Sequence, residues 1–171
     1  DQLAASNVAS LLARHGSPES LHRFSVDQPE AYWSGVLNAL GVRFDQPPQR
    51  MLDGVGEAGR WLPAARLNIT VSCFARPAEA SAIVYAGPDG AIQRISVGDL
   101  ERRACRVAAA LRTAGFAPGD AIAIDLPMTA ESVVIYLGIV LMGGAVVSIA
   151  DSFAPAEIAT RLALLGLDCI T

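Results

Sequence analysis

The stretch SVVIYLGIVLMGGAVVSIAD, residues 132–151, decides the fold, because it is long and holds no charged side chain before its final Asp. About 20 apolar residues would let one helix cross a bilayer. Gly143 and Gly144 interrupt the run at a point where a helix would end and the chain would turn. The residues that follow, AVVSI, are rich in β-branched side chains, as in a buried strand. We therefore predict a buried helix, a turn and a buried strand.

The flanks of this run also argue against a membrane span. Glu131 precedes it and Asp151 ends it, so neither side carries the Lys/Arg bias that orients a spanning helix. A membrane-attached helix–sheet protein remains the alternative, and solubility without detergent distinguishes the two.

The composition indicates an apolar globular chain of 171 residues, with 52% hydrophobic and 18% charged residues. Such a chain suits one domain with a core, or a piece of something larger. The net charge of −4 gives no support to nucleic-acid binding. All 13 basic residues are arginine, so a catalytic lysine would have to come from elsewhere. The chain starts at Asp1 without Met, and residues 168–171 resemble the start of a strand, so we expect a fragment.

The sequence contains no motif that indicates a metal-binding site or a catalytic nucleophile. His15 and His22 are separated by Gly16 and Pro18, which break a shared helix, and we predict no metal site. No GxSxG elbow occurs, and we assign no catalytic residue. Three isolated cysteines without a CxxC pair fit a reducing compartment: Cys73, Cys105 and Cys169.

The N-terminal part reads as helical and irregular. Helices are predicted to begin at Ser17-Pro18 and near Pro29, the second ending at Gly41. Residues 44–63, FDQPPQRMLDGVGEAGRWLP, are expected to wrap the surface without regular structure. The segment GVGEAG within them has the glycine spacing of the dinucleotide-binding fingerprint. It follows a Pro-rich segment and not a strand, so we predict a loop that binds no NAD.

From residue 81 strands and helices alternate. SAIVYA and AIQRIS flank GPDG as in a β-hairpin, and Ser96 is placed to cap a helix that ends at Gly115. PGD then leads to the strand AIAID, the helix and strand of residues 132–151, a helix over residues 155–165 and a final strand. We predict an α/β fold with a helical N-terminal extension, a hairpin and a mostly parallel, helix-covered sheet. The predicted domains are residues 1–80 and 81–171.

This order of elements resembles a known family. Residues 95–171, beginning ISVGDLERRACRVAAALRTAGFAPGDAIAIDLP, look like the opening of the large domain of acyl-adenylate-forming enzymes. Upstream, DQPEAYWSGVL and RWLPAARLNITVSCF resemble the N-terminal extension of acetyl-CoA-synthetase-like members. VVSIADSFAPAEIATRL resembles a plant peroxisomal-type acyl-activating branch. The resemblance implies an incomplete subdomain of the adenylate-forming fold.

The resemblance implies a two-step reaction in the full-length protein. A carboxylate and ATP, with Mg²⁺, give an acyl-adenylate and pyrophosphate, and CoA then displaces AMP. The family's phosphate loop, adenine pocket, metal-binding Glu and catalytic Lys lie downstream of this chain. We therefore expect an inactive N-terminal fragment of an acyl-CoA synthetase for a small carboxylic acid, with no cofactor bound. Its partner would be the remainder of its own chain, and its location cytoplasmic or peroxisomal.

One alternative accompanies this interpretation, in addition to the membrane-attached protein. A non-catalytic interaction or scaffold module with the same fold would share these elements. The apolar composition and an unpaired strand edge also predict self-association of the chain on its own.

The candidate site is the loop after the strand in residues 145–149. In acetyl-CoA-synthetase-like relatives the matching loop is Gly-rich and lies beside CoA. Here Asp151 and Ser152 stand in place of glycines, and Phe153 matches. The three residues are the candidate CoA-side contacts. The competing interpretation is a strand-to-helix loop capped by Ser152.

Overall fold

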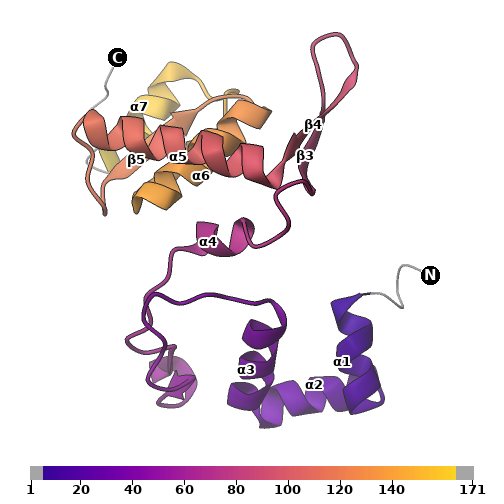
Figure 1. Cartoon of the computed structure of the whole chain (residues 1–171). Coiled ribbons are helices and arrows are strands. Elements are labelled where there is room, and N and C mark those ends of the chain that lie inside the picture. Colours follow the sequence, from indigo (N-terminus) through magenta and orange to yellow (C-terminus); the bar gives the residue numbers. More distant parts are fainter. Residues whose placement is uncertain (1–5, 165–171) are drawn as a thin grey trace. The chain divides into compact units, whose positions relative to one another are not determined.

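The computed structural model describes residues 6–164 and forms two compact units (Figure 1). The first unit is Asp1–Leu67 and the second is Asn68–Thr171. The strand predicted at residues 168–171 lies outside the described residues. The predicted domain boundary between residues 80 and 81 stays a prediction.

Three helices begin the first unit, and their ends follow from local chemistry. The hydroxyl of Ser17 accepts a hydrogen bond from the Ser20 N–H at 3.2 Å, which caps the second helix ahead of Pro18. Gly16 has φ +83° and separates the first two helices, so His15 and His22 lie on different helices, as predicted. The helices are α1 (Asn7–His15), α2 (Pro18–Asp27) and α3 (Pro29–Ala39).

Aromatic rings connect these helices. His15 stacks on Phe24 at 4.4 Å between ring centroids, and Phe24 meets Tyr32 edge-on at 6.3 Å. Trp33 lies 5.4 Å from Tyr32 and 6.3 Å from Trp61, again edge-on. No residue of α1, α2 or α3 is fully buried. Ring contacts, and not a deeply buried core, therefore hold these helices together.

Residues 44–63 differ from the expectation of an irregular wrap. Two short strands pair in antiparallel fashion around a single 3₁₀ turn, and Gly54 has φ +88° there. The GVGEAG segment is thus a hairpin turn and does not open an α-helix, which agrees with the predicted loop. The elements are β1 (Leu52–Asp53), η1 (Gly56–Ala58) and β2 (Arg60–Trp61).

The second unit is the predicted α/β arrangement. The strands β3 and β4 form an antiparallel hairpin, and β5 and β6 form a parallel pair in which Ala121 lies opposite Ala145. The elements are α4 (Ile69–Cys73), β3 (Ser81–Ala86), β4 (Ile92–Ser96), α5 (Val97–Thr113), β5 (Ala121–Asp125), α6 (Ala130–Met142), β6 (Ala145–Ile149) and α7 (Pro155–Leu164).

The core of this unit forms where α5 runs alongside α6 (Figure 1). Ala104 on α5 and Ile139 on α6 are each 0% exposed. Gly138 faces α5, and a Cβ there would lie 2.6 Å from the Val107 Cβ and 3.0 Å from the Ala104 carbonyl oxygen. The close approach of the two helices therefore requires glycine at position 138.

Helix α6 begins with a reciprocal cap and ends in a left-handed residue. The Ser132 N–H donates to Thr129 Oγ1 at 3.2 Å, and the Thr129 N–H donates to Ser132 Oγ at 3.1 Å. Gly143 ends the helix with φ +98°, and β6 begins at Ala145. The decisive stretch is thus helix, turn and strand, as predicted. Within residues 6–164 no helix combines the length and the apolar character that a membrane crossing needs.

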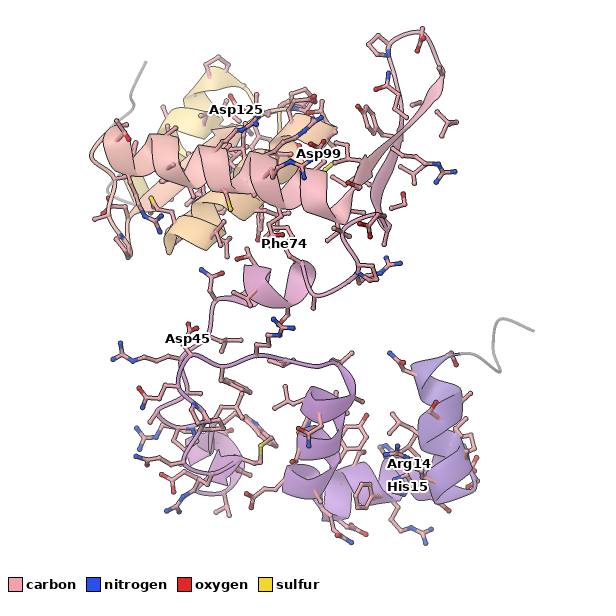
Figure 2. All side chains as sticks on the ribbon, viewed as in Figure 1. Arg14, His15, Asp45, Phe74, Asp99 and Asp125 are labelled. Carbon is pink, nitrogen blue, oxygen red and sulfur yellow. The ribbon has the colours of Figure 1, made fainter. Side chains whose placement is uncertain are left out.

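The side chain of Asn68 joins α4 to the end of α6. Its amide nitrogen donates to the carbonyl oxygens of Val140 at 2.8 Å and Leu141 at 3.3 Å. Its carbonyl oxygen accepts the Thr70 N–H at 3.1 Å and so caps α4. Phe74, which follows α4, packs against the core (Figure 2). The short helix is therefore fixed at both of its ends.

Candidate functional site

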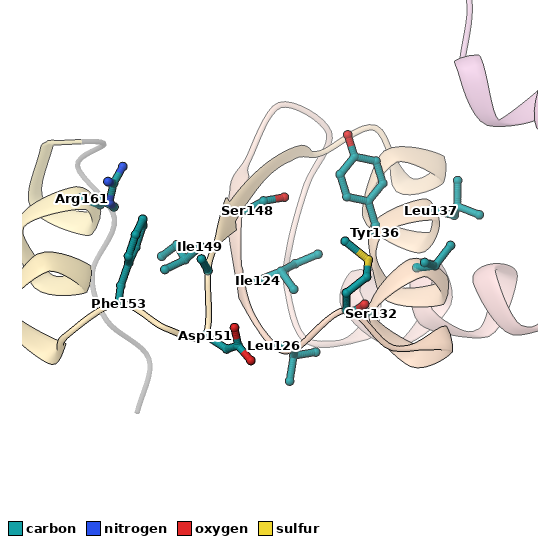
Figure 3. Close-up of a pocket in the computed structure, with 13 residues that line it drawn as sticks. Ile124, Leu126, Ser132, Tyr136, Leu137, Ser148, Ile149, Asp151, Phe153 and Arg161 are labelled. Carbon is teal, nitrogen blue, oxygen red and sulfur yellow. The ribbon is translucent and has the colours of Figure 1, made fainter. Parts of the chain in front are cut away.

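A pocket of about 650 Å³ lies at the carboxyl ends of β5 and β6 (Figure 3). This is the edge at which open parallel sheets bind ligands. The pocket reaches from α6, which contributes Tyr136 and Leu137, to α7, which contributes Arg161. Most of its lining is apolar and includes Ile124, Leu126, Val133, Ile149 and Phe153.

The predicted burial of α6 holds for most of the helix, and Glu131 and Tyr136 are its exposed residues. Leu137 is only half-buried, and Tyr136 is 46% exposed. Both side chains line the pocket, and Leu137 also packs against the core cluster of the second unit. The part of α6 that lines the pocket is therefore mostly apolar and only partly exposed.

The loop between β6 and α7 carries the three predicted site residues. Asp151 and Phe153 line the pocket, whereas Ser152 is exposed and is not part of the lining. The Phe153 N–H donates to the Ala150 carbonyl at 3.0 Å, which closes a turn. At the start of α7 the carboxylate of Glu157 accepts the Ala154 N–H at 3.2 Å. The loop is therefore held by its own backbone and by Glu157.

Arg161 is the charged residue that sequence reasoning missed. Its guanidinium carbon lies 4.3 Å from the centroid of the Phe153 ring, a cation–π contact. Phe153 precedes α7 and Arg161 lies near its end, so no helical spacing rule links the two. The sequence could have indicated Arg161 only as a basic residue in the helix that follows the candidate loop.

Two further pockets lie elsewhere among the described residues. One, of about 730 Å³, lies between the β3–β4 hairpin and the start of α6, where the Tyr85 hydroxyl donates to Gln93 Oε1 at 2.7 Å. The other, of about 280 Å³, lies in the first unit between Trp33 and Trp61. Among residues 6–164 no group of three or more His, Cys, Asp or Glu side chains is arranged to hold a metal ion.

The site therefore offers a binding surface with two charges at an apolar pocket. Asp151 and Arg161 are the charged side chains of its lining. An apolar floor with one cation suits an amphipathic ligand that carries an anionic group. Among the described residues, the lining holds no Cys, His or Lys to act as a strong nucleophile or base, so the arrangement is suited to binding and orienting a ligand.

Comparison with known proteins identifies two consecutive family matches. Residues 19–73 match the acetyl-coenzyme A synthetase N-terminus, and residues 71–171 match the AMP-binding enzyme. The two matches follow one another along the chain in the order that the sequence resemblance implied.

Individual relatives agree with these matches. The chain is 39% identical to "Probable acyl-activating enzyme 18, peroxisomal" of Arabidopsis thaliana over 94% of this chain and 25% of the relative. It is 29% identical to the acetyl-coenzyme A synthetase of Xylella fastidiosa over 84% of this chain and 24% of that protein. The chain thus spans about a quarter of the length of these relatives.

A solved structure agrees in fold over nearly the whole chain. The acetoacetyl-CoA synthetase from Streptomyces lividans superposes with a TM-score of 0.82 at 29% identity, covering 93% of this chain and 26% of that one. The resemblance to acyl-adenylate-forming enzymes is thereby confirmed. Because the AMP-binding enzyme match extends over more than half of its residues, the chain belongs to the AMP-binding enzyme family.

Proposed function

We propose that the chain is the N-terminal part of an ATP-dependent acyl-CoA synthetase. The observation that carries the proposal is the order of the two family matches, with the synthetase N-terminus at residues 19–73 and the AMP-binding enzyme at residues 71–171. The reaction would join a carboxylate to CoA through an acyl-adenylate, with release of pyrophosphate and AMP.

This chain would contribute the CoA side of the site. Of the proposed loop residues after β6, Asp151 and Phe153 line the pocket and the exposed Ser152 lies between them in sequence, and the lining combines an apolar floor with the Arg161 cation. These features fit a ligand with an extended, weakly polar arm and phosphates. When bound, CoA supplies the thiol that accepts the acyl group. The residues of this chain would bind and orient it.

The groups that hold ATP and Mg²⁺ would come from the rest of the full-length protein. Adenylate formation needs cations and backbone donors placed around the phosphates. The chain has no lysine, and its Gly-rich GVGEAG segment forms a hairpin turn. We therefore assign no catalytic residue, no ATP contact and no metal ligand here.

The substrate we propose is a small carboxylic acid. The names of similar proteins support this choice: acetyl-coenzyme A synthetase in Xylella fastidiosa and hexanoyl-CoA synthase in Cannabis sativa, 34% identical over 96% of this chain and 26% of that protein. The name of the Arabidopsis relative supports a peroxisomal location, and a cytoplasmic one is the alternative.

The test is carboxylate-dependent exchange of pyrophosphate into ATP. The full-length protein and residues 1–171 would each be assayed with acetate, acetoacetate and hexanoate. We expect exchange with at least one acid by the full-length protein and none by residues 1–171. Exchange by residues 1–171 would overturn the assignment, because the catalytic groups would then lie in this chain. A folded full-length protein without exchange would favour the non-catalytic interaction or scaffold module.

We also propose that residues 1–171 associate with themselves when the rest of the protein is absent. Met128, 91% exposed, and Leu126, 42% exposed, lie beside the open pocket. Light scattering during size-exclusion chromatography should show a mass that rises with concentration. A constant monomer mass would contradict this.

A further inference from the structure

We propose that Arg161, held against the ring of Phe153, is a phosphate-binding residue of the pocket at β5 and β6. The proposal rests on the proposed function, because the ligand class is CoA. It adds a named anion contact that lies outside the predicted loop, on α7.

The contact between the two side chains positions the cation. The guanidinium carbon of Arg161 lies 4.3 Å from the centre of the Phe153 ring, and the two side chains lie side by side at the α7 side of the pocket (Figure 3). A guanidinium stacked on a ring by its face keeps its N–H donors free at its edge. Those donors match the geometry of phosphate oxygens, which accept paired hydrogen bonds.

Among the described residues, 6–164, no carboxylate forms an ion pair with Arg161. Within residues 6–164 the ion pairs join arginines 50 and 60 to Asp53 and arginines 102 and 103 to Asp99. No carboxylate in that range comes within 4.0 Å of the Arg161 guanidinium. A cation at the edge of an apolar pocket attracts an anion more strongly than a cation in open water does, because the apolar lining screens the attraction less than water.

The remaining lining identifies the class of ligand. Val133, Tyr136 and Ile149 form an apolar surface on the α6 and β6 side. Arg161 lies at the other side, on α7. A ligand with a weakly polar, extended arm and a phosphate fits both sides, and CoA has this chemistry.

Substitution of Asp151 should change the KM for CoA in the direction opposite to substitution of Arg161. Asp151 is the other charged residue of the lining, and its carboxylate would repel a phosphate. Removing the charge of Asp151 should therefore strengthen CoA binding, while removing that of Arg161 should weaken it.

The experiment measures the KM for CoA in the full-length enzyme. We expect Arg161→Gln to raise this KM about tenfold or more, the loss expected for a hydrogen bond to a charged group. Asp151→Asn should lower it. Pyrophosphate exchange, in which CoA takes no part, should keep its rate in both variants. Arg106→Gln is the matched control, because Arg106 is exposed on α5 and does not line the pocket.

Pantetheine, which lacks the phosphates, separates phosphate binding from a general effect on the pocket. The Arg161→Gln penalty should disappear when pantetheine replaces CoA. A penalty of equal size for both thiols would overturn the proposal, and so would an unchanged KM for CoA with normal exchange. Loss of exchange in the unmodified full-length enzyme would instead overturn the proposed function. If the Arg161→Gln variant does not fold, the KM of the Asp151→Asn variant tests the proposal, because removing the carboxylate lowers the KM for CoA only when a phosphate binds near Asp151 and Arg161.

Discussion

Replacing Gly138 by alanine should force α5 and α6 apart. The added Cβ would lie 2.6 Å from both the Cβ and the Cγ1 of Val107 and 3.0 Å from the carbonyl oxygen of Ala104. Carbon atoms in optimal contact are about 3.5–4.0 Å apart. The shortfall is therefore about 1 Å, and it meets α5 at its backbone and at a β-branched side chain, which has little rotamer freedom in a helix. The helices have to separate to relieve it.

Two terms set the size of the effect. Overpacking of a well-packed core costs about 1–3 kcal/mol. Alanine in place of glycine inside a helix returns about 1 kcal/mol. Because one of the close contacts is to backbone, we expect the upper part of the overpacking range. The net loss in the free energy of unfolding should be about 1–2 kcal/mol.

The assay has to follow the second unit. Both tryptophans, Trp33 and Trp61, lie in the first unit, so their fluorescence reports on residues 1–67. Hydrogen exchange of the α5 and α6 amides, measured against denaturant, reports on the helices that the substitution separates. Faster exchange in both helices is the expected result.

Gly35→Ala is the matched control. Gly35 lies inside α3, and a Cβ built there has no heavy atom within 4 Å beyond its chain neighbours and the nearby backbone of its own helix. The same substitution should therefore stabilise α3 by up to about 1 kcal/mol, and tryptophan fluorescence can follow it. If Gly138→Ala stabilised its unit as Gly35→Ala does, the close approach of α5 and α6 would be wrong.

Three other predictions follow from burial and hydrogen bonding. Ile139→Ala, at a fully buried side chain, should cost about 2–5 kcal/mol in the free energy of unfolding, and Leu137→Ala should cost clearly less because it is half-buried; equal losses in denaturant melts would contradict this. Asn68→Ala should cost about 1–2 kcal/mol and raise hydrogen exchange in α4 before α6; unchanged α4 exchange would show that the cap is dispensable. The pKa of Glu19 is lowered below its usual 4.5, first by a hydrogen bond from the Glu19 backbone N–H and then by one from the Ser17 hydroxyl. The contribution of Glu19 to stability is therefore present above pH 4.5 and is lost as the pH falls through the lowered pKa. An NMR titration that gives a pKa of 4.5 or higher would refute this.

The ends of the elements were predictable because short-range chemistry decides them. Gly143, with φ +98°, ends α6, and β6 occupies the predicted residues Ala145–Ile149. Ser96 caps α5 by accepting the Asp99 N–H at 3.2 Å. Each of these features depends on residues within a few positions of one another, which the sequence displays directly.

The faces of the elements were not predictable in the same way. A helix as apolar as α6 does not indicate which side meets α5 and which lines the pocket, and Leu137 packs against the core while also lining the pocket. Gly138 reveals its role only beside Val107, and Arg161 only beside Phe153. The β1–β2 hairpin was missed because strands of two residues are too short to show an alternating pattern. The CoA contacts of Asp151, Ser152 and Phe153 stay predictions.

The side chain of Asn68 has a practical consequence for how the protein is shortened. The synthetase N-terminus match extends to residue 73, and a biochemist who removes that segment would begin the recombinant chain at residue 74. That cut would discard an amide which holds the last turn of α6 from 72 positions upstream. Expression that starts at residue 68 would retain the amide together with α4. The AMP-binding part should therefore express as a stable protein only from the earlier start.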